Sequence, residues 1–157
     1  YATMGTLLVS IFVCAVIGKL LFGWLSDHFD KGLIMLIAVI NLGVGLVILR
    51  LVGPNDIVLA YAYAVVYGIG FSGAFTMIQL MIAELYAGHQ YGRILGVFVL
   101  VDTLAGAAGI AILGALRVQL GSYLPAFNLM IALCIAAALC VVLMNGLISK
   151  KPESAAA

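Results

Sequence analysis

Long apolar runs separated by short polar breaks are the feature that most constrains how this chain can fold. A helix needs about 20 consecutive apolar residues to cross the hydrocarbon core of a bilayer. Five runs of about that length or longer follow one another, at residues 4–25, 33–52, 57–86, 93–116 and 122–147. The clearest break, at residues 53–56, reads GPND, a strong turn sequence. The pattern therefore predicts five membrane-spanning segments.

The composition supports helices that face lipid. Charged residues make up 8% of the 157 residues and hydrophobic residues 66%, with a mean hydropathy of +1.31. A soluble domain carries roughly a quarter charged residues, because water must wet its surface. Membrane strands would be segments of roughly ten residues that alternate in polarity, whereas these runs are longer and apolar throughout. We therefore expect an all-α membrane protein, with a helical bundle at residues 1–148 and a cytoplasmic tail at residues 149–157.

The basic residues predict how the spans are oriented. Because spans alternate in direction, the first break, the break at residues 87–92 and the tail share one side. That side holds five of the seven basic residues, and the other side holds Arg50 and Arg117. Cytoplasmic loops are enriched in Lys and Arg, so we expect the C-terminus inside and the N-terminus outside. Repeated bundles usually have even helix counts, so these five helices would form an incomplete six-helix bundle whose partner helix lies upstream.

Asp102 is the charged residue that stands out within a span. A carboxylate at this depth costs about 2.5–3.5 kcal/mol on insertion scales and tends to be functional. Apolar residues flank it on both sides, and Gly106 and Gly109 follow on the same helical face. One interpretation is a carboxylate that couples transport to a proton or ion, or a counter-charge in the transport path. The other is a structural hydrogen bond to a neighbouring helix.

A polar stripe runs along the third span. Ser72, Thr76 and Gln79 are spaced at i, i+4 and i+7 and so share one helical face. Such a stripe lines a substrate path or joins two membrane helices, because polar side chains commonly hold such helices together. Asn41 is a lone amide in the second span, and for it we expect a packing role.

The sequence contains no arrangement that predicts an enzyme, a metal site or a cofactor. His28 and His89 fall in short breaks without metal-ligand spacing, and no nucleophile elbow or phosphate loop is present. The three cysteines lie inside apolar runs and are interpreted as small buried side chains. A net charge of +1 gives no sign of nucleic-acid binding, which needs a basic surface.

The break after the first span resembles the signature loop of the major facilitator superfamily. The stretch at residues 18–32 reads GKLLFGWLSDHFDKG. The positions that match the signature are Gly18, Lys19, Gly23, Ser26, Asp27 and Lys31. His28, Asp30 and Gly32 depart from it, and these departures indicate the weaker, C-terminal copy of the loop.

Further stretches resemble the same superfamily. Residues 83–88 and 91–96, AELYAG and YGRILG, are similar to the link between its tenth and eleventh helices, and residues 121–127 to the start of its twelfth. The resemblance therefore covers helices eight to twelve. The alternative is that the chain corresponds to helices two to six of the N-terminal half. The short tail after residue 147 argues against this, because a long central loop would be expected there. Residues 67–73, YGIGFSG, together with the link resemble the monocarboxylate and oxalate/formate porters.

The resemblance implies part of a secondary active transporter that moves a small solute, such as an organic anion, by alternating access. It also implies a cytoplasmic gate in which Asp27 pairs with Arg93, with Lys31 and Glu84 in the same charge relay. The partners would be the lipid bilayer, the N-terminal half of the same transporter and the solute, and the location a bacterial plasma membrane. The alternative is a structural or assembly subunit of a membrane complex that transports nothing.

Overall fold

The computed structural model describes residues 2–53, 56–86, 88 and 90–149, and these form five α-helices. The helices are α1 (Ala2–His28), α2 (Lys31–Leu51), α3 (Ile57–Leu85), α4 (Tyr91–Leu120) and α5 (Leu124–Ser149). Each contains a stretch long and apolar enough to cross a membrane. The prediction of an all-α protein with five spans is therefore confirmed. Apart from Ser149, the predicted tail lies outside the described residues.

The ends of the helices follow from local chemistry. Asp30 caps α2, because its carboxylate accepts a hydrogen bond of 3.2 Å from the backbone N–H of Gly32. α4 continues past the predicted span until Gly121, which adopts the left-handed conformation (φ +64°) that glycine tolerates without strain. Pro125 lies in the first turn of α5, where its missing N–H costs little.

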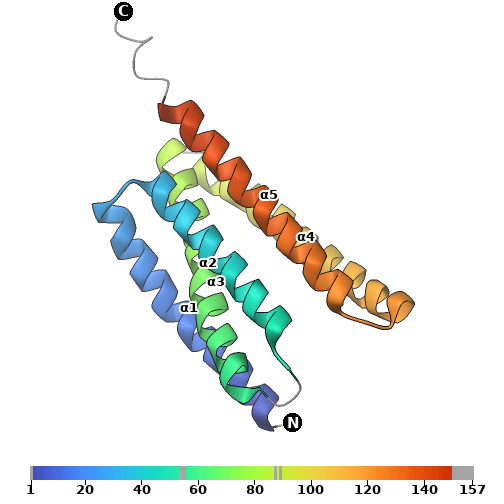
Figure 1. Cartoon of the computed structure of the whole chain (residues 1–157). Coiled ribbons are helices and arrows are strands. Elements are labelled where there is room, and N and C mark those ends of the chain that lie inside the picture. Colours follow the sequence, from blue (N-terminus) through green and yellow to red (C-terminus); the bar gives the residue numbers. More distant parts are fainter. Residues whose placement is uncertain (1, 54–55, 87, 89, 150–157) are drawn as a thin grey trace, which may run out of the picture.

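α3 lies between α1 and α2, and α5 packs on the far side of α2 (Figure 1). α4 runs beside α5 and meets α3 as well. With 29 and 30 residues, α3 and α4 are about 45 Å long at 1.5 Å per residue. Since the hydrocarbon core is about 30 Å thick, both helices must tilt or extend beyond it.

Glycines bring α3 into backbone contact with both of its neighbours. A β-carbon at Gly68 would lie 2.7 Å from the carbonyl oxygen of Ile11 in α1, and one at Gly70 would lie 2.6 Å from the backbone nitrogen of Leu42 in α2. Neither position has room for a larger residue unless the helices separate. Close approach through small residues is a common way in which membrane helices associate.

A single amide also links α2 and α3. The side chain of Asn41 donates a hydrogen bond of 3.2 Å from Nδ2 to the carbonyl oxygen of Val66. Hydrogen bonds of this kind between membrane helices contribute about 0.6 kcal/mol on average. The packing role predicted for Asn41 is therefore the one found in the structure.

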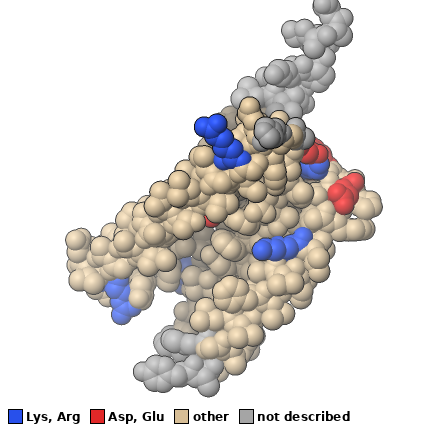
Figure 2. Space-filling view, turned by 180° about the vertical axis from the view of Figure 1, so that it is seen from behind, with Lys and Arg blue, Asp and Glu red and all other residues tan. Residues whose placement is uncertain are grey.

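The buried core gathers α1, α2, α3 and α5 around their shared end. It contains Phe22, Ile34, Met35, Ala38, Val39, Met77 and Val141. α4 contributes no buried residue, and a β-carbon added at any of its glycines, including Gly106 and Gly109, would enter open space with no neighbouring atom within 4 Å. The face shown in Figure 2 is mostly uncharged and carries only a few charged side chains. Such an apolar exterior suits contact with lipid or with further membrane helices.

Candidate functional site

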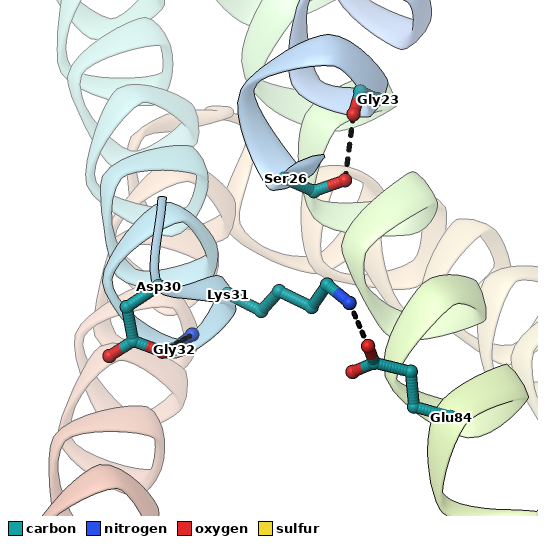
Figure 3. Close-up of polar contacts among 6 residues, drawn as sticks. All are labelled: Gly23, Ser26, Asp30, Lys31, Gly32 and Glu84. Carbon is teal, nitrogen blue, oxygen red and sulfur yellow. Dashed lines mark hydrogen bonds and ion pairs between the residues drawn. The ribbon is translucent and has the colours of Figure 1, made fainter. Parts of the chain in front are cut away.

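Charged residues from two helices meet at the end of the bundle that carries the signature loop. Lys31, at the first position of α2, donates from its ammonium group to the carboxylate of Glu84, near the end of α3 (Figure 3). These residues are 53 positions apart in the sequence, and the antiparallel course of α2 and α3 brings them together. This contact confirms that the break after α1 and the C-terminal end of α3 lie on the same side.

The end of α5 closes the same region. A β-carbon on Gly32 would collide with the side chain of Asn145, so α5 rests directly on the first turn of α2. A cavity of about 470 Å³ lies here, with Asp30, Lys31, Glu84 and Asn145 among its lining residues. Lys31 and Glu84 are two of the residues predicted for the gate, whereas Asp30 was noted only as a departure from the signature and Asn145 was not predicted. The preference of Asp for helix N-caps could have identified Asp30, whereas no sequence signal pointed to Asn145.

The ion pair is accessible to water and therefore weak. The side chain of Lys31 is 28% exposed and that of Glu84 is 57% exposed. Ion pairs exposed to this degree contribute about 0–1 kcal/mol to the stability of the fold, because solvent screens the charges and both side chains lose conformational freedom. A contact of this strength can break and re-form without unfolding the bundle.

Asp27 and Arg93 stand apart from this pair. Asp27 lies in the last turn of α1 and Arg93 in the first turn of α4, and both are exposed. In the described part of the chain, Lys31–Glu84 is the ion pair, and none joins Asp27 to Arg93. Arg93 instead lies on a groove between α3 and α4. The structure thus brings together two of the four residues predicted for the gate.

The residues of the polar stripe of α3 differ in their surroundings, and Ser72 is the one that packs against another helix. Ser72 is buried against Gly18 of α1, and its hydroxyl donates a hydrogen bond of 3.1 Å to the carbonyl oxygen of Ile69. The hydroxyl of Thr76 donates a hydrogen bond of 2.8 Å to the carbonyl oxygen of Ser72. Gln79 is half-buried on the same helix. Of the two interpretations of the stripe, these contacts favour the helix interface for Ser72.

Asp102 lies near the middle of α4, 11 residues from its first residue, with an exposed side chain among exposed apolar neighbours. Val101 and Leu104 beside it are 59% and 61% exposed. The neighbouring Thr103 satisfies its hydroxyl within α4, through a hydrogen bond of 2.8 Å to the carbonyl oxygen of Val99. The described residues offer no ion-pair partner to the Asp102 carboxylate.

Comparison with known proteins identifies the family. Searches of curated proteins and of solved structures gave no match. A scan against protein-family profiles matched the Major Facilitator Superfamily over residues 1–156. Because this match spans nearly the whole chain, the protein belongs to the Major Facilitator Superfamily, a family of membrane-embedded secondary transporters that are not enzymes.

Proposed function

We propose that the five helices are helices eight to twelve of a twelve-helix carrier that moves a small organic anion by alternating access. The observation that carries this proposal is the ion pair between Lys31, in the signature loop, and Glu84, in the following link. It joins two separate stretches that resemble the family, at one end of the bundle. In this assignment α1 to α5 form most of the C-terminal half, and the N-terminal half completes the transport path.

The charged end of the bundle would serve as a gate on the cytoplasmic side of a bacterial plasma membrane. Lys31 and Glu84 link the ends of α2 and α3, while Asp27 and Arg93 remain exposed and available for partners that change during transport. An ion pair that forms in one state and breaks in the other shifts the equilibrium between them. In the proposed gate Asp27 pairs with Arg93 in the state in which the cytoplasmic ends are closed.

Replacing Asp27 with Asn in the complete carrier is expected to lower the transport rate and leave expression intact. The substitution keeps the size of the side chain but removes the charge that the gate requires. Transport is measured as initial uptake into cells at matched amounts of carrier in the membrane. Asp56→Asn is the matched control, since it removes a charge at the opposite end of α2 and α3 while Asn can still accept the hydrogen bond from the backbone N–H of Gly53. Unchanged uptake in Asp27→Asn would remove Asp27 from the gate.

The proposed substrate class is tested by uptake of radiolabelled small monocarboxylates into proteoliposomes that contain the complete carrier. We expect accumulation when a proton gradient is imposed and little accumulation without one. The proposal rests on the resemblance of residues 67–73 to the monocarboxylate porters. Failure to take up any monocarboxylate would reject the organic-anion assignment and direct the search to cations, sugars and drugs. Failure to transport any solute would favour the alternative of a structural or assembly subunit.

A further inference from the structure

A groove between the end of α3 and the beginning of α4 contributes only Arg93 to the proposed transport cycle. Its volume is about 550 Å³. Ile82 of α3 forms one wall, and one face of α4, including Phe98 and Val101, forms the other. Gln90 and Arg93 supply its polar groups. The groove thus combines an apolar trough with a single cationic side chain.

The polarity of the groove changes along the axis of α4. Gln90 and Arg93 lie at the helix start, the end at which a membrane-spanning α4 would approach the membrane surface. Val101 is eight residues beyond Arg93, which corresponds to about 12 Å along the helix. The hydrocarbon of one leaflet is about 15 Å deep, half of the ~30 Å core. A polar group at the surface above an apolar trough of this depth matches a phospholipid molecule.

Charge identifies the kind of lipid. The guanidinium of Arg93 is exposed and forms no ion pair with a described residue. Glu84, two residues after Ile82, is already paired with Lys31, so it does not cancel the charge of Arg93. Arginine binds phosphate oxygens well, because its planar group donates two parallel hydrogen bonds. By contrast, the groove of about 340 Å³ between α2 and α5 is lined by apolar residues and Cys134 and offers no cation.

We infer that the α3–α4 groove binds an anionic phospholipid, with its phosphate on Arg93 and one acyl chain along α4 towards Val101. A small water-soluble anion would use Arg93 alone and leave the apolar trough unfilled. Arg93 also belongs to the proposed gate, and the lipid would occupy it when the pair with Asp27 is open. The lipid site itself does not depend on that gate, because it is defined by the groove and tested by binding rather than by transport.

The test measures lipids bound to the complete carrier by native mass spectrometry, with phosphatidylglycerol and phosphatidylcholine as probes. A basic residue near the membrane surface contributes about 1 kcal/mol to binding anionic lipid, so Arg93→Gln should weaken phosphatidylglycerol binding about fivefold. Phosphatidylcholine binding should change little. Val97→Trp should weaken phosphatidylglycerol binding as well, because the indole fills the groove and leaves Arg93 in place.

Arg117→Gln is the matched control, because Arg117 lies at the other end of α4. Its guanidinium lies over the ring of Tyr123, with Cζ 4.0 Å from the ring centroid. The substitution should leave phosphatidylglycerol binding unchanged. The inference is overturned if Arg93→Gln and Arg117→Gln bind phosphatidylglycerol equally well, or if Val97→Trp binds it as the unmodified carrier does. It is also overturned if short monocarboxylates displace the phospholipid, since the site would then hold a free anion.

Discussion

Replacing Gly70 with Ala is expected to destabilise the carrier by about 1–3 kcal/mol, the usual cost of forcing atoms into a filled interior. The added β-carbon would lie 2.6 Å from the nitrogen and 2.9 Å from the Cα of Leu42. Both are backbone atoms of α2, so they cannot rotate out of the way as the end of a side chain could. The helices must separate, and the buried contacts between α2 and α3 loosen with them. The measurement is the midpoint of thermal unfolding of the purified carrier in detergent.

Two other glycines provide graded controls. A β-carbon on Gly43 would meet only the sulfur of Cys134, at 3.3 Å, and this side chain can move, so the effect of Gly43→Ala should be smaller. No atom of the described residues lies within 4 Å of the corresponding position on Gly146. Gly146→Ala should be neutral or slightly stabilising, because glycine in a helix costs about 0.5–1 kcal/mol relative to alanine. If all three variants unfold at the same temperature, close backbone packing at Gly70 is not what holds α2 to α3.

The helices could be predicted from the sequence because the signals that define them are local. Each apolar run is interrupted within a few residues by turn formers, and in a membrane each helix satisfies its own backbone hydrogen bonds. The ends were less predictable. α4 extends to Gly121 although its run loses apolar character at Arg117, because a left-handed glycine rather than a charge ends the helix.

The contacts between helices depend on information that no single segment carries. The sequence placed Lys31 and Glu84 in one charge relay, but their direct pairing depends on how α2 and α3 align along their length. Likewise, the stripe position of Ser72 is consistent with a cavity or an interface, and only its close approach to Gly18 in α1 favours the interface. Asn145 of α5 reaches Gly32 although more than 100 residues separate the two in the sequence.

Asp102→Asn in the complete carrier is expected to abolish proton-driven accumulation of the solute. α4 exposes this carboxylate near its middle, about 16 Å from the helix start, among apolar side chains that suit lipid or helix contact. A permanent charge facing hydrocarbon there would cost about 2.5–3.5 kcal/mol. The carboxylate must therefore face a cavity, pair with another group or bind a proton. A proton that binds from one side of the membrane and is released to the other would couple the proton gradient to transport. Asparagine keeps the shape of the side chain but cannot exchange a proton.

Two assays separate coupling from damage to the transport path. The Asp102→Asn carrier should lose accumulation against a gradient but retain exchange of labelled for unlabelled solute, because exchange needs the substrate site and not a net proton movement. Thr103→Val is the matched control, since among the described residues the Thr103 hydroxyl bonds only to the carbonyl oxygen of Val99 within α4. It should retain both activities. Undiminished accumulation in Asp102→Asn would leave the carboxylate a structural role, whereas loss of exchange together with accumulation would place Asp102 in the substrate path itself.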